Sequence, residues 1–233
     1  MPFQTSVNYQ PSPGVAGAFC SANPRASVVA GAGAFVAGAN GANVGLFAWT
    51  DAATNTIVSN SGQGLPRGFI ANELQAMITN WMGESSMNIP AGRPVTLFNE
   101  GDFWMSTSTA ASIGQKIFAS FIDGSIRTGA PGSVFTDSAF TATTSGTTLT
   151  VSAMTSGTIV VGQLISGAGV PANTYVTGMA SGTTGGVGTY TVSQPSTIST
   201  GEAMTGTNSI ETKWYAGSIE GAGSLIKTSS WGY

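Results

Sequence analysis

The sequence predicts a mainly β protein in which a small uncharged β module is inserted into a larger β domain. Short apolar runs alternate with Gly and Pro turns along most of the 233 residues, a pattern typical of sandwiches and barrels. Only one segment has the spacing of a helix. A span from Ser138 to Gly201 contains no Asp, Glu, Lys or Arg. These observations favour a barrel-like or sandwich fold with at most one short helix.

The composition indicates a folded chain with an uncharged polar surface. Charged residues make up only 7% and hydrophobic residues 41%, against about 25% charged residues in typical soluble domains. Disordered chains combine low hydrophobicity with high net charge, whereas this chain has a net charge of −3. Its seven basic residues are scattered, so they form no stripe for nucleic acid and no patch for anionic lipid.

The most apolar stretch, Val28 to Trp49, does not resemble a membrane helix. A transmembrane helix needs about 20 mostly apolar residues, but this stretch is interrupted by Asn40, Asn43 and several glycines. We expect two buried strands joined by a turn around Asn40-Gly41. The N-terminus lacks the basic region and the apolar run of a secretory signal, so no membrane partner is expected.

The first part of the chain predicts a series of short strands separated by turn residues. The expected strands are ASVVAG, GAFVAG, VGLFAW, TIVSN, MNIPAG, PVTLF, DFWMS and KIFASFIDGS. The one helical candidate is FIANELQAMITNWM, residues 69–82, whose apolar residues recur at i, i+4 and i+8. A bent pair of strands is the alternative for this segment.

The uncharged span alternates as strands do. In TTLTVSAM, the residues Leu149, Val151 and Ala153 fall on one face and hydroxyl side chains fall on the other. The further runs TIVVGQLIS, TYVTGM and GTYTVS follow at roughly ten-residue spacing with Gly and Pro between them. A flexible linker needs no such pattern, so the span is predicted to fold as a small sandwich or barrel.

Charge and tryptophan return after the uncharged span. The strand-like runs TKWYAGSIE and SLIKTSSW are too short to form a core of their own, so they are expected to join the N-terminal domain. The predicted division is therefore an extended arm at 1–14, a β domain at 15–137 plus 206–233, and an inserted module at 138–205.

The residue inventory removes most catalytic chemistry. The chain has no histidine and one cysteine, Cys20, so it contains neither a Ser-His-Asp nor a Cys-His system and no zinc ligand set. The closest carboxylate pair, Glu100 and Asp102, lies in NEGDFW, which we interpret as a polar turn. No catalytic, cofactor-binding or metal-binding residue is predicted, and no enzyme is expected.

One long run is similar to a known family. The segment SGQGLPRGFIANELQAMITNWMGESSMNIPAGRPVTLFNEGDFWM resembles the structural cement (head decoration) proteins of tailed bacteriophages. The flanking GLFAWTD and QKIFASFIDGS and the closing SLIKTSSW extend the resemblance. Within 138–205, TTLTVSAMTSGTIVVGQLISGAGVPANTYVTG and GGVGTYTVS resemble the Ig-like β module of phage structural proteins.

This resemblance implies a non-enzymatic, cofactor-free virion protein that is made in the host bacterial cytoplasm. Such proteins bind the outer surface of an icosahedral head and clamp neighbouring subunits of the major capsid protein. A homotrimer on a local symmetry axis is expected, with a homodimer as the alternative. A second function stays open: a surface or tail-fibre accessory protein that binds host-surface glycan through the Ig-like module.

Two sets of residues are candidates for the capsid or subunit interface. The arm MPFQTSVNYQPSPG is suited to main-chain pairing with a partner, with Phe3, Val7 and Tyr9 as anchors; a frayed terminus is the alternative. Phe103 and Trp104 are adjacent, so on a strand they point to opposite faces. At least one of them is expected to face a partner or a second sheet.

Overall fold

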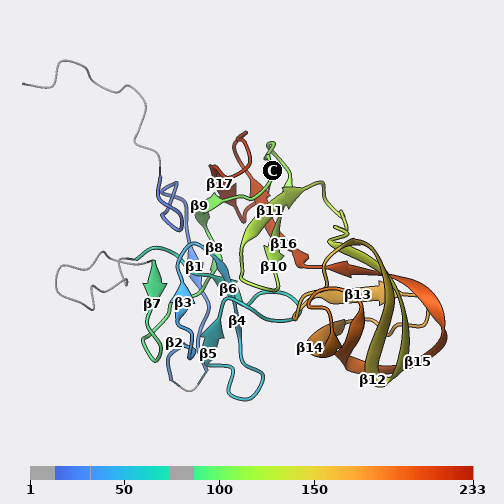
Figure 1. The fold of residues 1–233 in the computed structure, drawn as a ribbon. Helices are drawn as coiled ribbons and strands as arrows, with labels where there is room; N and C mark the ends of the chain where they lie inside the picture. The colour runs from blue at the N-terminus through green and yellow to red at the C-terminus, as the bar shows by residue number, and fades with distance from the viewer. Residues whose placement is uncertain (1–13, 32, 74–86, 233) are drawn as a thin grey trace, which may run out of the picture.

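The regular structure of the described chain is entirely β. The computed structural model describes residues 14–31, 33–73 and 87–232, and within them seventeen strands form four sheets and no helix occurs (Figure 1). The prediction of a mainly β fold is confirmed. The helical candidate began at Phe69, which lies in strand β6 (Gly68–Phe69), and most of it falls at 74–86, outside the described residues.

A six-stranded sheet is formed by the N-terminal part of the chain. Its order is β1-β8-β6-β4-β5-β2, and every neighbouring pair is antiparallel except β2 with β5. Beside β6, its strands are β1 (Ala26–Ser27), β2 (Val36–Ala37), β4 (Phe47–Thr50), β5 (Ile57–Ser59) and β8 (Phe98–Glu100).

A five-stranded sheet combines the middle of the chain with its C-terminal tail. Its order is β11-β10-β16-β17-β9, so the two tail strands lie between β10 and β9 (Figure 1). All its pairs are antiparallel. Its strands are β9 (Asp102–Ser106), β10 (Lys116–Ser120), β11 (Ile126–Gly129), β16 (Ser209–Ala216) and β17 (Leu225–Ser229).

The expected strand pair around Asn40-Gly41 forms differently. A turn is present, with Gly41 at φ +74°, but the strands on either side diverge. Strand β2 pairs with β5, while β3 (Ala42–Asn43) pairs with β7 (Asn88–Ile89) in a separate two-stranded sheet. A Cβ at Gly41 would stand 2.5 Å from Asn88 Oδ1, so β7 packs directly against the turn and takes the position of a hairpin partner.

The two larger sheets share one hydrophobic core. Its aromatic rings come from both sheets: Phe47, Phe69 and Phe98 from the six-stranded sheet, and Phe103 and Trp214 from the five-stranded sheet. A second cluster contains Phe35 and smaller aliphatic residues such as Val58 and Ile89, which come from the N-terminal half of the chain. We call these three sheets with their two cores the body.

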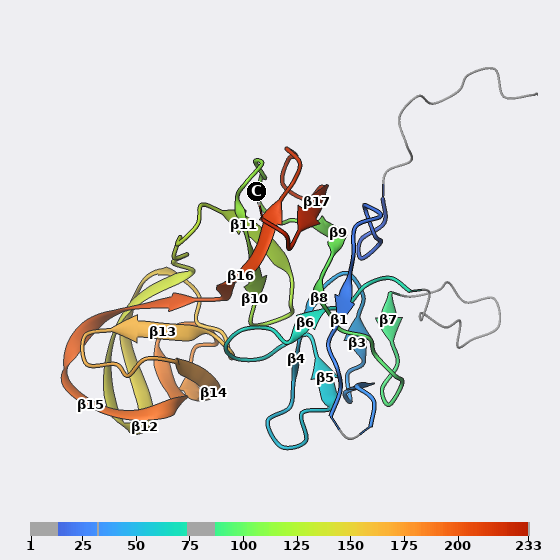
Figure 2. The same ribbon diagram turned by 180° about the vertical axis from the view of Figure 1, so that it is seen from behind.

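A four-stranded sheet, which we call the module, lies to one side of the body (Figures 1 and 2). Its order is β12-β15-β13-β14, with a further pairing of β15 with β14. Its strands are β12 (Ser138–Gly157), β13 (Leu164–Gly167), β14 (Thr174–Gly182) and β15 (Gly188–Thr207), and they enclose a core of their own. Leu149 and Val151 are buried in it. Ala153 is exposed, because register pairing with β15 ends at Val151.

The chain enters and leaves the module at one place, which we call the neck. Ser138 and Gly206 are register partners, and the Asp137 amide donates to the Gly206 carbonyl at 2.8 Å. Arg127 donates two hydrogen bonds of 2.7 Å to the Asp137 carboxylate and one of 2.7 Å to Ser209 Oγ. The Asn208 amide donates to Asp137 Oδ2 at 2.7 Å.

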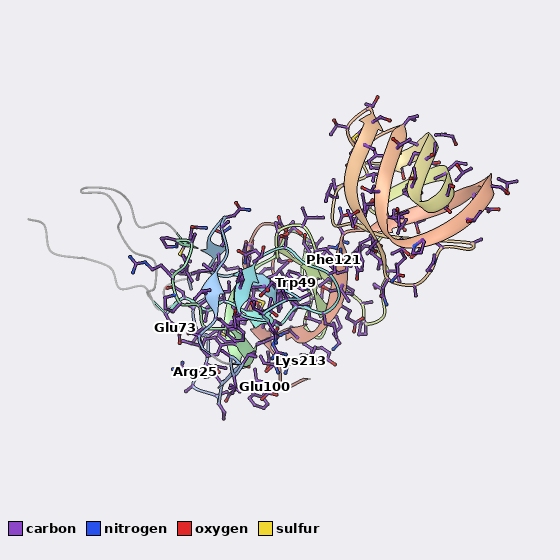
Figure 3. All side chains as sticks on the ribbon, turned by 90° about the horizontal axis from the view of Figure 1, so that it is seen from below. Arg25, Trp49, Glu73, Glu100, Phe121 and Lys213 are labelled. Atoms are coloured by element: carbon purple, nitrogen blue, oxygen red, sulfur yellow. The ribbon has the colours of Figure 1, made fainter. Side chains whose placement is uncertain are left out.

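One aromatic side chain of the module packs into the body. Tyr175 is buried with the body core, and its ring meets Phe121 edge-on at 5.4 Å between centroids. Its hydroxyl accepts a hydrogen bond of 3.0 Å from the Gly64 amide. Figure 3 shows Trp49 and Phe121 on the side of the body that faces the module. The module is therefore held at the neck and at Tyr175.

A membrane-crossing helix is not found in the described part of the chain, since none of its segments forms a long apolar helix.

Candidate functional site

The structure separates the residues that the sequence singled out. Phe3, Val7 and Tyr9 lie outside the described residues. Phe103 is 0% exposed and packs in the body core. Trp104 points the other way, to the outer face of the five-stranded sheet, and is half-buried. Of the two neighbours, only Trp104 offers surface to a partner in this structure.

Trp104 stands where the N-terminal segment meets the sheet. The Gly17 amide donates to the Trp104 carbonyl and the Trp104 amide donates to the Ala18 carbonyl, both at 2.8 Å. The free edge of β9 is therefore covered by this segment. A Cβ at Gly14 would lie 2.3 Å from Trp104 Cδ1, so the chain crosses the indole at a position that only glycine fits.

The outer face of this sheet carries cations held on aromatic rings. Lys227 Nζ lies 5.4 Å from the Trp104 ring centroid, and Lys116 Nζ lies 3.7 Å from that of Tyr215. At the other end, Arg127 Cζ lies 3.8 Å from the ring centroid of Phe135, a residue of the segment that follows β11. Four of the seven basic residues of the chain lie on this face: Lys116, Arg127, Lys213 and Lys227.

Carboxylates balance most of that charge. Lys213 Nζ is 3.3 Å from Glu100 Oε1 (Figure 3), and Lys116 Nζ is 3.9 Å from Glu211 Oε1. The third pair is Arg127 with Asp137 at the neck. The face therefore combines aromatic rings with paired charges, and it does not present a field of one sign.

At the expected polar turn, Glu100 and Asp102 each contact other side chains of the protein. Asp102 is 9% exposed, and its Oδ2 accepts hydrogen bonds of 2.6 Å from both Ser21 Oγ and Asn23 Nδ2. Its Oδ1 is buried without a hydrogen-bond partner in the described part of the chain. Glu100 is engaged with Lys213. The two carboxylates thus serve separate contacts, one in each of two strands.

Burial and hydrogen bonding shift the pKa values of Cys20 and Asp137. Burial and the nearby Asp102 charge raise the pKa of the Cys20 thiol, which favours the neutral form. Burial alone would raise the pKa of the Asp137 carboxyl, but hydrogen bonds from Arg127 and Asn208 outweigh it and lower that pKa. Across residues 14–31, 33–73 and 87–232, no group of three or more potential ligands is placed to hold a metal ion.

Comparison with known proteins identifies the family. The family model of the XM1 gp53 minor capsid protein matches residues 3–151, more than half of the 233 residues. The chain belongs to this family. Members of a minor capsid protein family are virion components, so the chain is a phage capsid-related structural protein.

The chain was also compared with curated proteins and with solved structures. A search of curated proteins gives no match. A chain in a solved structure of the capsid of Myoviridae phage XM1 aligns over 99% of this chain and 98% of its own length, at 14% sequence identity and a TM-score of 0.40. A TM-score this low does not establish a common fold.

The sequence did not predict that the basic residues of the five-stranded sheet lie together on one face. Its basic residues lie between Lys116 and Lys227, and they gather only because β16 and β17 insert between β10 and β9. Alternation within each strand was the available signal. In TKWYA it already places Lys213 and Tyr215 on the face opposite Trp214.

Proposed function

We propose that this protein is a structural cement protein of a phage head. It binds the outer surface of the icosahedral shell and clamps neighbouring subunits of the major capsid protein. The observation that carries the proposal is membership of a minor capsid protein family over residues 3–151. Binding to the assembled lattice in preference to loose subunits stabilises the lattice by mass action, and this role requires no enzymatic activity.

The outer face of the five-stranded sheet supports this role. Interfaces are enriched in aromatic residues and Arg, and this face has Trp104, Tyr215 and Arg127. The cations of this face are held by ring contacts: Lys227 lies over Trp104, Lys116 over Tyr215, and Arg127 over Phe135. We place the contact of the body with the capsid here. Gly14, the first described residue, lies beside Trp104, and we propose Phe3, Val7 and Tyr9 as further anchors on the capsid.

We further propose that 138–205 is an inserted Ig-like module that faces away from the shell. Its separate core and its single crossing point support an insertion. The alternative function, glycan binding by the module, finds little support in its aromatic residues. Phe140, Tyr175 and Tyr190 are all buried, so none of them offers a ring face for a sugar.

Electron microscopy of decorated heads tests the proposal. Purified protein is added to mature heads that lack it, and density is expected at regular positions on the outer lattice. Absent or randomly placed density would falsify the cement function. The same maps give the oligomeric state, for which we propose a homotrimer on a local symmetry axis.

A further inference from the structure

The segment between β5 and β6 is an exposed loop with a fixed backbone. Side chains of Ser61, Gln63, Leu65 and Arg67 are exposed, while the residues between them are half-buried. Leu65 is 69% exposed, one of the largest values for an apolar side chain in the described chain. An exposed loop on a rigid scaffold is a common location for binding residues.

Four hydrogen bonds join the backbone of the loop to the rest of the protein. The Gly62 amide donates to the Phe121 carbonyl at 3.0 Å, and the Arg67 amide donates to the Ala48 carbonyl at 2.8 Å. At Gly64, the amide donates to Tyr175 Oη and the carbonyl accepts from Trp49 Nε1, both at 3.0 Å. Strands of the body and the module thus fix the loop together.

Two glycines make this anchoring specific. A Cβ at Gly62 would lie 2.2 Å from Trp49 Cγ, so the indole packs flush against the backbone. Gly64 has φ +70°, a conformation that favours glycine. A loop ordered before binding loses less conformational entropy when a partner docks.

Leu65 forms a ridge between two hollows. One hollow of about 380 Å³ is lined by Trp49, Gln63, Arg67 and Asn99, and another of about 140 Å³ is lined by Phe47, Lys213 and Trp214; both are also lined by Leu65 and Pro66. The second hollow connects the loop to Lys213, which lies on the outer face of the five-stranded sheet. The ridge is therefore separated by one hollow from Lys213, a residue of the face that we propose as the capsid contact.

Arg67 has a charge that no described side chain neutralises. Lys116, Arg127 and Lys213 are paired with carboxylates, and Arg25 and Lys227 lie over aromatic rings. In the described part of the chain, neither Arg67 nor Arg93 forms an ion pair or a ring contact with another residue, and of the two only Arg67 lines a hollow together with Leu65. A carboxylate on a partner would complement it.

We infer that Gln63–Arg67 is a docking ridge for the major capsid protein. Leu65 enters an apolar socket on the capsid subunit, and Arg67 pairs with a carboxylate at the rim of that socket. This inference rests on the proposed cement function and adds the contact and its chemistry. Arginine is one of the residue types enriched in interface hot spots, which lie in well-packed, desolvated pockets.

Binding to heads that lack this protein tests the ridge. Leu65→Ser and Arg67→Glu are each expected to weaken binding at least about tenfold, as hot-spot substitutions do. The matched controls are Val187→Ser in the module and Arg93→Glu in the body, which change an exposed aliphatic residue and an exposed arginine away from the proposed contact and should bind as wild type. Unchanged circular dichroism and melting temperature establish that each variant is folded.

The outcomes separate the ridge from the function on which it depends. If the wild-type protein does not bind heads, the cement function fails and the ridge fails with it. If wild type binds and both ridge variants bind equally well, the ridge is overturned while the cement function stands.

A photo-crosslinking residue at Gln63 gives a readout that does not depend on affinity. On decorated heads, an adduct with the major capsid protein is expected. Adducts with a second copy of this chain alone, or no adduct on heads that are decorated, would overturn the assignment.

Discussion

Phe103 and Trp104 are adjacent in β9 and have opposite structural roles. The Phe103 ring centroid lies 5.1 Å from that of Phe69, 5.2 Å from Phe19, and 5.5 Å from both Phe98 and Trp214. Trp104 instead lies half-buried on the outer face. The first residue thus stabilises the core, and the second is available to a partner.

Removal of the Phe103 ring should destabilise the fold. Phe103→Ala deletes a fully buried aromatic ring, and such changes lower the free energy of unfolding by about 3–5 kcal/mol. Denaturant titration followed by tryptophan fluorescence measures the loss. Trp104→Ala is the control, because its ring is only partly buried and the loss should be clearly smaller. Equal losses would contradict the assignment of the two faces.

The sequence could predict that these neighbours point apart but not which one points inward. Both are large aromatic residues, so hydrophobicity does not distinguish them. The choice depends on register with β17, where Thr228 pairs with Phe103 and Lys227 with Trp104. The Thr228 hydroxyl donates to the Phe103 carbonyl across 125 residues of sequence, a distance that local pattern does not cover.

At the scale of elements, the neck joins the strands that lead into and out of the module. Arg127→Ala should lower the free energy of unfolding by about 1.5–3 kcal/mol, the range for hydrogen bonds to charged groups. Arg127→Lys should retain only part of the stability that Arg127→Ala loses, because an ammonium cannot form the same bidentate pair. Thermal denaturation measures both. Full recovery by lysine would show that charge alone stabilises the neck.

The neck also predicts a dependence on acid. The folded-state pKa of Asp137 is lowered, so its stabilising contribution is fully present above the unfolded pKa of about 3.9. That contribution is lost as pH falls through the lower folded pKa. Denaturant titrations between pH 7 and pH 2 should show this loss in wild type and a weaker one in Asp137→Asn. Parallel curves would contradict the role of Asp137.

Strand prediction succeeded where alternation was long enough. DFWMS coincides with β9, and the four runs of the uncharged span each overlap a strand of the module. Strand β6 is only two residues long, and its second residue, Phe69, falls in the helical candidate, because two residues show no period. Strand β11 was also missed. The strands β12 and β15 are each 20 residues long, which runs of six to nine residues did not predict.

At the scale of the whole molecule, deletion of the module tests its independence. Deletion of Ala139 to Thr205 with the ends joined should leave a soluble folded β protein, because the body retains its three sheets. Its melting temperature should fall, since Tyr175 and Leu164 pack with the body core. Circular dichroism and thermal denaturation measure both. An unfolded product would contradict the proposed insertion.

The composition break was the best guide to this organisation. The uncharged span from Ser138 to Gly201 lies within the stretch of chain from β12 to β15, which runs from Ser138 to Thr207. Composition could not predict how the module is held. That depends on single contacts such as Tyr175 with Gly64, whose residues lie 111 positions apart.

Attachment to heads should depend only weakly on salt. Three of the described cations are paired within the chain, and two more lie over rings, so few charges remain for salt to screen. Binding measured from low to moderate ionic strength should therefore change little. A steep loss over that range would indicate an interface built mainly on ion pairs.

The single crossing at the neck makes the module exchangeable. Ser138 and Gly206 are antiparallel register partners, so their Cα atoms are about 5 Å apart. A foreign domain whose own ends lie that close could replace the module without displacing β11 or β16. Heads that carry such a chimera would display the foreign domain in as many copies as the shell binds.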